Sequence, residues 1–156
     1  MTDLHPAVVP FAPLLGTWRG KGAGEYPSIA PFEYTEELVF EAVHPSKPVI
    51  AYRHKTARCL DGAPLHSETG FLRPGVVCHW TVAQSTGVAE ASVGSWAPDE
   101  GVLLLSSSSL GGADKVVAVE RQYTVRDGQL SYVISMATTS SPLLPHLRAS
   151  LTRDTC

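Results

Sequence analysis

The chain has 156 residues, 44% of them apolar, which is enough for one domain with a sizeable core and too apolar for a disordered chain. Twelve basic and fifteen acidic residues, with no cluster of Lys or Arg, argue against a nucleic-acid partner. No apolar run approaches the roughly 18 residues that span a bilayer, and the first residues lack a signal-peptide pattern. We therefore expect a cytoplasmic protein, with no membrane association, whose residues 1–156 form a single domain.

The first predicted element is a short helical segment over Pro6–Leu15, which Pro10 and Pro13 keep irregular and Gly16 ends. We expect Phe11 and Leu15 of this segment to cover one end of the fold. A further short turn is expected near Ser141–Pro145. Strand patterns recur about every ten residues and predict ten strands, at 16–25, 34–43, 49–58, 65–73, 76–84, 87–95, 102–109, 116–126, 129–139 and 146–153.

Clear turn signals separate these strands, and the strongest is Asp127-Gly128, because a two-residue Asp-Gly loop favours a type I′ hairpin. Many short strands at even spacing are typical of an all-β sandwich or barrel. We predict an antiparallel up-and-down barrel, which has no open strand edge. A barrel of more than eight strands has room inside for a ligand.

Alternation along the strands indicates a half-buried sheet. In the strand 116–126 the residues that share a face with Val119 and Tyr123 are apolar, except for Arg121. In the strand 34–43 both faces are mixed, since Glu36 shares one face with Tyr34 and Glu37 lies on the other. The pattern therefore leaves the inner face of that strand undecided.

Glycine occupies every second position from Gly20 to Gly24, within the segment Gly16–Pro27. Period two places Trp18, Tyr26 and these glycines on one strand face, which is thereby stripped of side chains. Such a face marks either a bend at a barrel corner or a close approach by a ligand or another backbone.

His146 is the best candidate for a metal ligand, since it follows the stiff apolar segment Pro142–Pro145 at the predicted rim of the barrel. Strict alternation, however, places His146 on the polar face with Arg148 and points it outward. Either a bulge at Pro145 or a later strand start would point the ring inward. No zinc motif, nucleophile elbow or phosphate loop is present. The cysteines Cys59, Cys78 and Cys156 are expected to be reduced thiols, the first two within strands.

The pattern Gly-x-Trp-x-Gly-x-Gly-x-Gly-x-Tyr-Pro over Gly16–Pro27 resembles the signature of the nitrobindin family. Further segments are similar to the family in the same order, namely Phe32–Glu37, Pro64–Pro74, Thr86–Glu90, Ser135–Thr139 and Pro145–Leu147. The resemblance runs from about residue 13 to residue 153. It implies a ten-stranded barrel similar to lipocalins and fatty-acid-binding proteins.

The resemblance also implies one haem b per chain, with His146 as the axial ligand of the iron. Residues implied to contact the haem are Ser28, Leu65, His66, Lys115 and Met136. Ser28 stands where the family usually has threonine, and Lys115 would reach a haem propionate as a compact cation. His66 would lie on the distal side, as a possible catalytic residue, although a histidine at the barrel rim is an equal alternative.

The function implied by the resemblance is binding of nitric oxide and isomerisation of peroxynitrite to nitrate at ferric haem. The iron would act as a Lewis acid on the peroxo oxygen, while the protein supplies the axial ligand and excludes water. The alternative is a metal-free barrel that binds a small apolar ligand such as a fatty acid. A further alternative is an interaction protein in which the glycine strand packs against a neighbour.

Overall fold

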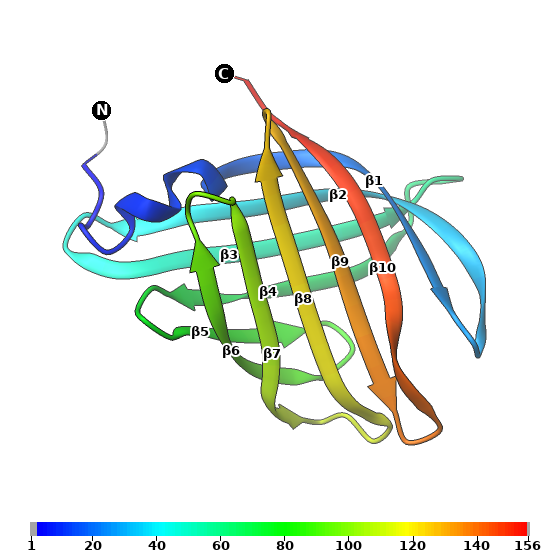
Figure 1. Cartoon of the computed structure of the whole chain (residues 1–156). Helices are drawn as coiled ribbons and strands as arrows, with labels where there is room; N and C mark the ends of the chain where they lie inside the picture. The colour runs from blue at the N-terminus through cyan, green and yellow to red at the C-terminus, as the bar shows by residue number, and fades with distance from the viewer. Residues whose placement is uncertain (1–2, 156) are drawn as a thin grey trace.

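In the computed structural model, which describes residues 3–155, the strands close into one antiparallel barrel (Figure 1). Each strand pairs with its neighbours in sequence, and β1 pairs with β10 to close the sheet. The predicted ten-stranded barrel is thus confirmed. The elements are the 3₁₀ helix η1 (Val9–Leu14) and the strands β1 (Gly16–Tyr26), β2 (Ile29–His44), β3 (Lys47–Arg58), β4 (Pro64–Arg73), β5 (Cys78–Gln84), β6 (Ala89–Ala97), β7 (Val102–Gly111), β8 (Val116–Arg126), β9 (Gln129–Thr138) and β10 (Ser141–Arg153).

Two strands, β2 and β10, begin five residues earlier than predicted. β2 includes Pro31 and β10 includes Pro142 and Pro145, residues that usually interrupt a ladder because proline has no amide donor. In β10 the pairing with β9 shifts between Ser141 and Leu144 and again between Pro145 and Leu147, so the strand accommodates its prolines at irregular positions. The turn expected near Ser141–Pro145 is therefore wrong, and this segment belongs to the strand.

One end of the barrel is closed by η1. Phe11 and Leu14 are buried there, and the Phe11 ring stacks on Trp96 with ring centroids 5.2 Å apart. The indole of Trp18 donates a hydrogen bond of 3.0 Å to the Leu14 carbonyl. The segment was predicted to use Leu15, but Leu14 takes this place and Leu15 is only half-buried.

The glycines of β1 make room for aromatic rings of β2. Gly22 and Gly24 are buried, and a Cβ atom on either would overlap the ring of Tyr34 or Phe32, respectively. The glycine pattern predicts a ligand or another backbone beside this face, whereas at Gly22 and Gly24 aromatic side chains of the neighbouring strand take that place. The inner face of β2 is the one that carries Tyr34, Glu36, Leu38 and Phe40, all of which are buried.

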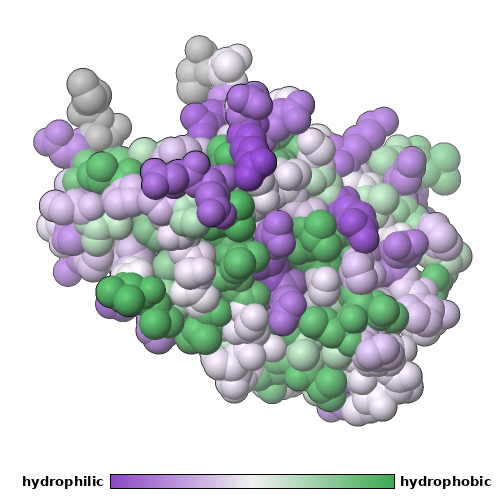
Figure 2. Space-filling model, viewed as in Figure 1, coloured by the Kyte–Doolittle hydropathy of each residue, from purple (hydrophilic) through white to green (hydrophobic). Residues whose placement is uncertain are grey.

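The outer surface carries polar and apolar side chains side by side, with polar residues gathered near the two termini (Figure 2). Of the cysteines, Cys78 is buried in β5, whereas Cys59 is exposed in the turn after β3 and is not the strand residue we expected. Cys156 lies outside the described residues. Within residues 3–155, no helix has the length and apolar character needed to cross a membrane.

Candidate functional site

A cavity of about 410 Å³ lies inside the barrel, at the end away from η1. Strand positions place it there, because Gly24 of β1 pairs with both Phe32 and Leu147 on the cavity wall, whereas η1 adjoins the start of β1. Toward the barrel centre the wall carries the buried polar side chains of His54, Glu68 and Arg121, and apolar side chains such as Phe32, Leu65 and Val116 lie nearer the strand ends. It is lined by Phe32, Tyr34, His54, Thr56, Leu65, His66, Glu68, Gln84, Thr86, Val88, Val116, Val119, Arg121, Ile134, Met136, His146 and Leu147.

His146 lines this cavity together with its neighbour Leu147. Two consecutive residues of a regular strand point to opposite faces, so both reach the interior only because the pairing with β9 shifts between Pro145 and Leu147. The bulge that the sequence offered as one alternative is therefore present. His146 also borders a second hollow of about 540 Å³ outside the mouth.

The His146 ring is held by two neighbours from β1. Its Nδ1 lies 3.0 Å from the backbone carbonyl of Glu25, and since a carbonyl only accepts, Nδ1 carries the hydrogen. The Tyr26 ring contacts it edge-on, with centroids 5.4 Å apart, and the Tyr26 hydroxyl donates 3.1 Å to the Met136 carbonyl. In the neutral ring this leaves the lone pair on Nε2, which is the arrangement of a metal-ligating histidine whose other nitrogen donates to a carbonyl.

Of the other sequence-predicted residues, Leu65, His66 and Met136 line the same cavity as His146. β4, which carries Leu65 and His66, lies four strands from β10 one way around the barrel and six the other way, so it faces His146 across the interior. The structure does not bring Ser28 and Lys115 to the cavity wall. Both are exposed, Ser28 in the turn between β1 and β2 and Lys115 directly before β8.

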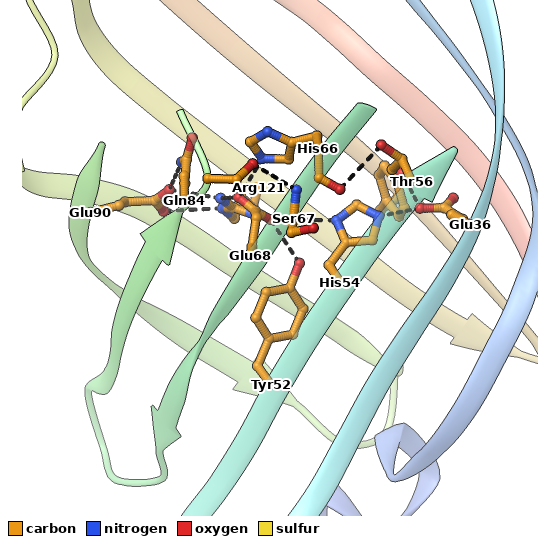
Figure 3. A network of polar contacts seen from close by, with 12 residues as sticks. Glu36, Tyr52, His54, Thr56, His66, Ser67, Glu68, Gln84, Glu90 and Arg121 are labelled. Atoms are coloured by element: carbon orange, nitrogen blue, oxygen red, sulfur yellow. Dashed lines mark hydrogen bonds and ion pairs between the residues drawn. The ribbon is translucent and has the colours of Figure 1, made fainter. Parts of the chain in front are cut away.

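The polar end of the cavity rests on a buried network that sequence reasoning missed, apart from Arg121 (Figure 3). The Arg121 guanidinium bridges two carboxylates, with Nη2 lying 2.7 Å from Glu68 Oε2 and 2.7 Å from Glu90 Oε1. Tyr52 donates to Glu68 Oε1 over 3.0 Å. Arg121 is 2% exposed, Glu68 6% and Glu90 1%, so this ion network is desolvated.

His54 connects this network to a third carboxylate. Its Nε2 makes a short hydrogen bond to Glu36 Oε2, and its Nδ1 lies 3.4 Å from Glu68 Oε1. Burial by itself lowers the pKa of His54, but the hydrogen bonds and charges of Glu36 and Glu68 outweigh burial and raise that pKa to about 9. Burial likewise acts to raise the pKa of Glu68, yet the Arg121 charge holds it well below its usual range. The imidazolium form of His54 can donate to both carboxylates at once.

The alternation of side chains between the two faces of a strand is the sequence feature that could have located this network. Glu36, His54 and Glu68 each occupy the position in their strand that alternates with exposed residues and shares a face with buried ones. In the sequence Arg121 stands out as a break in an apolar face, while the face of Glu36 stays undecided. Only the closed barrel shows that network residues from five different strands, β2, β3, β4, β6 and β8, meet at one point.

Fold and site together define a class of protein. It is a closed β-barrel with an interior ligand cavity and, at the cavity mouth, a histidine whose Nδ1 donates to a backbone carbonyl and leaves Nε2 free to bind a metal. Comparison with known proteins identifies the family within this class. The chain belongs to the family of THAP4-like, heme-binding β-barrel domains, whose model matches residues 7–153, and this confirms the resemblance to nitrobindins.

Curated relatives match nearly the whole chain. A protein of Arabidopsis thaliana named peroxynitrite isomerase Rv2717c is 48% identical over 151 residues, which cover 95% of this chain and 89% of the relative. Peroxynitrite isomerase 1 of Mycolicibacterium paratuberculosis is 43% identical over 161 residues and covers 98% of both chains. The crystal structure of Rv2717c from M. tuberculosis superposes with a TM-score of 0.87 at 41% identity, covering 98% of this chain and 100% of that one.

The residues present fit a haem group. A neutral imidazole with its Nδ1 hydrogen fixed by a carbonyl is a suitable axial ligand, and the wall near His146 offers apolar side chains such as Phe32, Leu65 and Met136 to a porphyrin face.

Proposed function

We propose that the chain binds one ferric haem b through Nε2 of His146, binds nitric oxide and isomerises peroxynitrite to nitrate, in the cytoplasm. The observation that carries this proposal is the inward bulge at His146, which turns the ring into the cavity while Glu25 fixes its tautomer. The names of the relatives, peroxynitrite isomerases at 43–48% identity, support the reaction.

Bound haem supplies a Lewis acid that polarises the peroxo oxygen and helps the O–O bond to break. The chain itself contributes orientation and exclusion of water. Tyr26 and the Glu25 carbonyl hold the ring of His146, and the apolar wall near the mouth keeps reacting species away from bulk water. Across the cavity, the Nε2 atom of His66 lies 3.5 Å from Glu68 Oε2, so the Glu68 carboxylate can orient the His66 ring at the cavity wall.

A hemin titration tests the ligand assignment. We expect the wild-type chain to take up one equivalent of hemin and to keep its Soret band through dialysis. The variant His146→Ala is expected to lose this stable binding, since no second imidazole of the described residues lies beside it on β10. The matched control is His79→Ala, which removes an exposed histidine of β5 and is expected to bind hemin like the wild type.

The β-rich circular dichroism of His146→Ala should match that of the wild type. Retention of hemin affinity in this variant would contradict the assignment. A chain that takes up no hemin but binds fluorescent fatty acids would instead support a metal-free barrel for apolar ligands. With hemin bound, stopped-flow mixing with peroxynitrite should show accelerated decay and an increased nitrate yield, and nitric oxide should shift the Soret band.

For Lys115 and Ser28, which lie outside the cavity wall, the haem contacts implied by the family resemblance remain part of this proposal. Lys115 directly precedes Val116, which lines the cavity, and its exposed ammonium can pair with a propionate at the mouth. We expect Lys115→Ala to weaken hemin binding modestly, more at low salt than at high salt, and Lys115→Arg to restore it. Equal affinities for all three proteins at low salt would remove Lys115 from the site.

A further inference from the structure

Three buried side chains form a directed chain of hydrogen bonds beside the cavity. The Tyr132 hydroxyl donates to Glu36 Oε2 over 2.6 Å, so its oxygen is free to accept. The hydroxyls of Tyr34 and Tyr132 lie 2.8 Å apart, and because the Tyr132 hydrogen is engaged with Glu36, Tyr34 is the donor in that pair. The order of donation is therefore Tyr34 to Tyr132 to Glu36.

One end of this chain faces the cavity and the other is shielded. Tyr34 is on the cavity wall, whereas Glu36 and Tyr132 are not among the residues that line it. Tyr34 and Tyr132 are 1% and 2% exposed, so neither phenol is in contact with bulk water. The Tyr34 phenol at the cavity wall can transfer an electron directly to a molecule in the cavity. Its proton, in contrast, must move along the hydrogen bonds to Tyr132.

The far end of the chain can accept a proton. Glu36 Oε2 receives hydrogen bonds from Tyr132 and His54, and no described residue donates to Oε1. Glu68 provides a contrast within the same network, because both of its oxygens are bound by the Arg121 guanidinium. The carboxylate of Glu36 thus retains an oxygen without a hydrogen-bond donor, while that of Glu68 is neutralised by a permanent cation.

Maintaining a buried carboxylate is costly, since a well-packed apolar group of similar size is often as stable or more stable. Burial, followed by the Glu36 charge, raises the pKa of Tyr132 far above its usual range, so this phenol does not ionise without another change. Loss of an electron from Tyr34 is such a change, because it makes the Tyr34 phenol strongly acidic and moves its proton onto the Tyr132 oxygen, from which the Tyr132 proton can pass to Glu36.

We propose that Tyr34, Tyr132 and Glu36 form a redox-active triad that reduces nitrogen dioxide in the cavity to nitrite. This rests on the proposed function, because homolysis of the peroxo O–O bond releases nitrogen dioxide whenever it fails to recombine to nitrate. Tyr34 loses one electron to nitrogen dioxide, which becomes nitrite. At the same time the Tyr34 proton moves to the Tyr132 oxygen and the Tyr132 proton moves to Glu36 Oε2. The products are a Tyr34 phenoxyl radical, a neutral Tyr132 and a protonated Glu36.

The role of the triad would be to keep escaping oxidant from reaching bulk water. A second phenol that donates a hydrogen bond to a buried carboxylate, that of Tyr52 to Glu68, provides an internal comparison with the triad. Tyr52 does not line the cavity, and its partner carboxylate is bound by Arg121, so it lacks both features of the triad.

The test is pulse radiolysis of the full chain in nitrite solution, which generates nitrogen dioxide without any haem. We expect a tyrosyl radical by optical absorption and electron paramagnetic resonance in the wild type, with nitration mapped by mass spectrometry to Tyr34. Tyr34→Phe should reduce the radical yield to background, and Glu36→Gln should slow its formation about tenfold or more, as removal of a general base does. Tyr52→Phe should match the wild type.

A solvent isotope effect in the wild type is a further measurement and needs no variant. Radical formation should be slower in D₂O, because a proton moves with the electron. Equal yields in the wild type and Tyr34→Phe, nitration confined to other tyrosines, or no isotope effect would overturn the triad.

With hemin bound and peroxynitrite as substrate, Tyr34→Phe should lower the nitrite yield and increase nitration of added free tyrosine. Since the radiolysis arm requires no haem, a failed hemin titration would contradict the proposed function and leave the radiolysis result to decide on the triad.

Discussion

At the end covered by η1 the barrel is closed by apolar packing of Phe11, Leu14 and Trp18, whereas at the cavity end regular strand geometry is broken in several places. There β1 has glycine at positions 22 and 24, β10 carries a bulge, and charged residues are buried. The comparison shows that one end contributes mainly stability. At the other end, irregular strand geometry and buried charges form the site. Mutations at the closed end should therefore change mainly the free energy of unfolding, and mutations of cavity residues should also change hemin binding.

The largest effect is expected from Arg121→Met at the cavity end. This change leaves Glu68 and Glu90 buried without their cation, and removal of one partner from a buried ion network costs about 3–5 kcal/mol. Urea unfolding measures the loss. As a control, Arg121→Met combined with Glu68→Gln and Glu90→Gln removes the uncompensated charges and should recover most of the stability. A loss below about 1 kcal/mol for the single variant would show that the network is not desolvated as described.

The next largest effect is expected from Phe11→Ala at the closed end. Truncation of a buried phenylalanine costs about 3 kcal/mol or more, and here it also removes the stacking on Trp96. Hemin affinity should stay unchanged, because η1 lies away from the cavity. Val9→Ala in the same helix is the matched control, since Val9 is exposed and its truncation should change the free energy of unfolding by less than about 0.5 kcal/mol. A parallel loss of hemin affinity in Phe11→Ala would break the distinction between the two ends.

A smaller effect is expected from Gly22→Ala, which tests the glycine face. The new Cβ would overlap the Tyr34 ring, and overpacking of this kind costs about 1–3 kcal/mol. The displaced ring should also lose its hydrogen bond to Tyr132. Gly111→Ala in β7 is the control, because its nearest neighbour would be the Ala89 Cβ at 3.8 Å, an ordinary contact. Equal stability of Gly22→Ala and Gly111→Ala would contradict the close approach.

The most gradual effect is expected from pH. The pKa of His54 is raised from 6.5 to about 9 in the folded chain, so folding favours the protonated ring. Its contribution to stability is complete below pH 6.5 and is lost as the pH rises through about 9. The urea midpoint of the wild type should decrease as the pH rises through this window. In His54→Gln the midpoint should depend less on pH. A urea midpoint that rises with pH over this window in the wild type, but not in His54→Gln, would contradict the predicted direction of the effect.

Much of the fold could be predicted from the sequence, because alternation and turn chemistry are local. The Asp127-Gly128 turn, for example, links β8 and β9 as expected. The early starts of β2 and β10 could not be predicted, since their prolines are tolerated only where the neighbouring strand shifts register. For the site, the sequence and its family resemblance singled out His146, Leu65, His66, Met136, Ser28 and Lys115. The cavity brings the first four together and does not include the last two.

The sequence by itself determined the ten strands, the stripped face of β1 and the family, since each depends on residues close together along the chain. Only the tertiary structure decided that His146 turns inward, because the bulge arises from its pairing with β9. It also decided that Glu36 meets Tyr132 and His54, which lie on other strands. Period two assigns a face to each residue, but barrel closure sets which residues on that face come into contact, and this depends on the register of all ten strands at once.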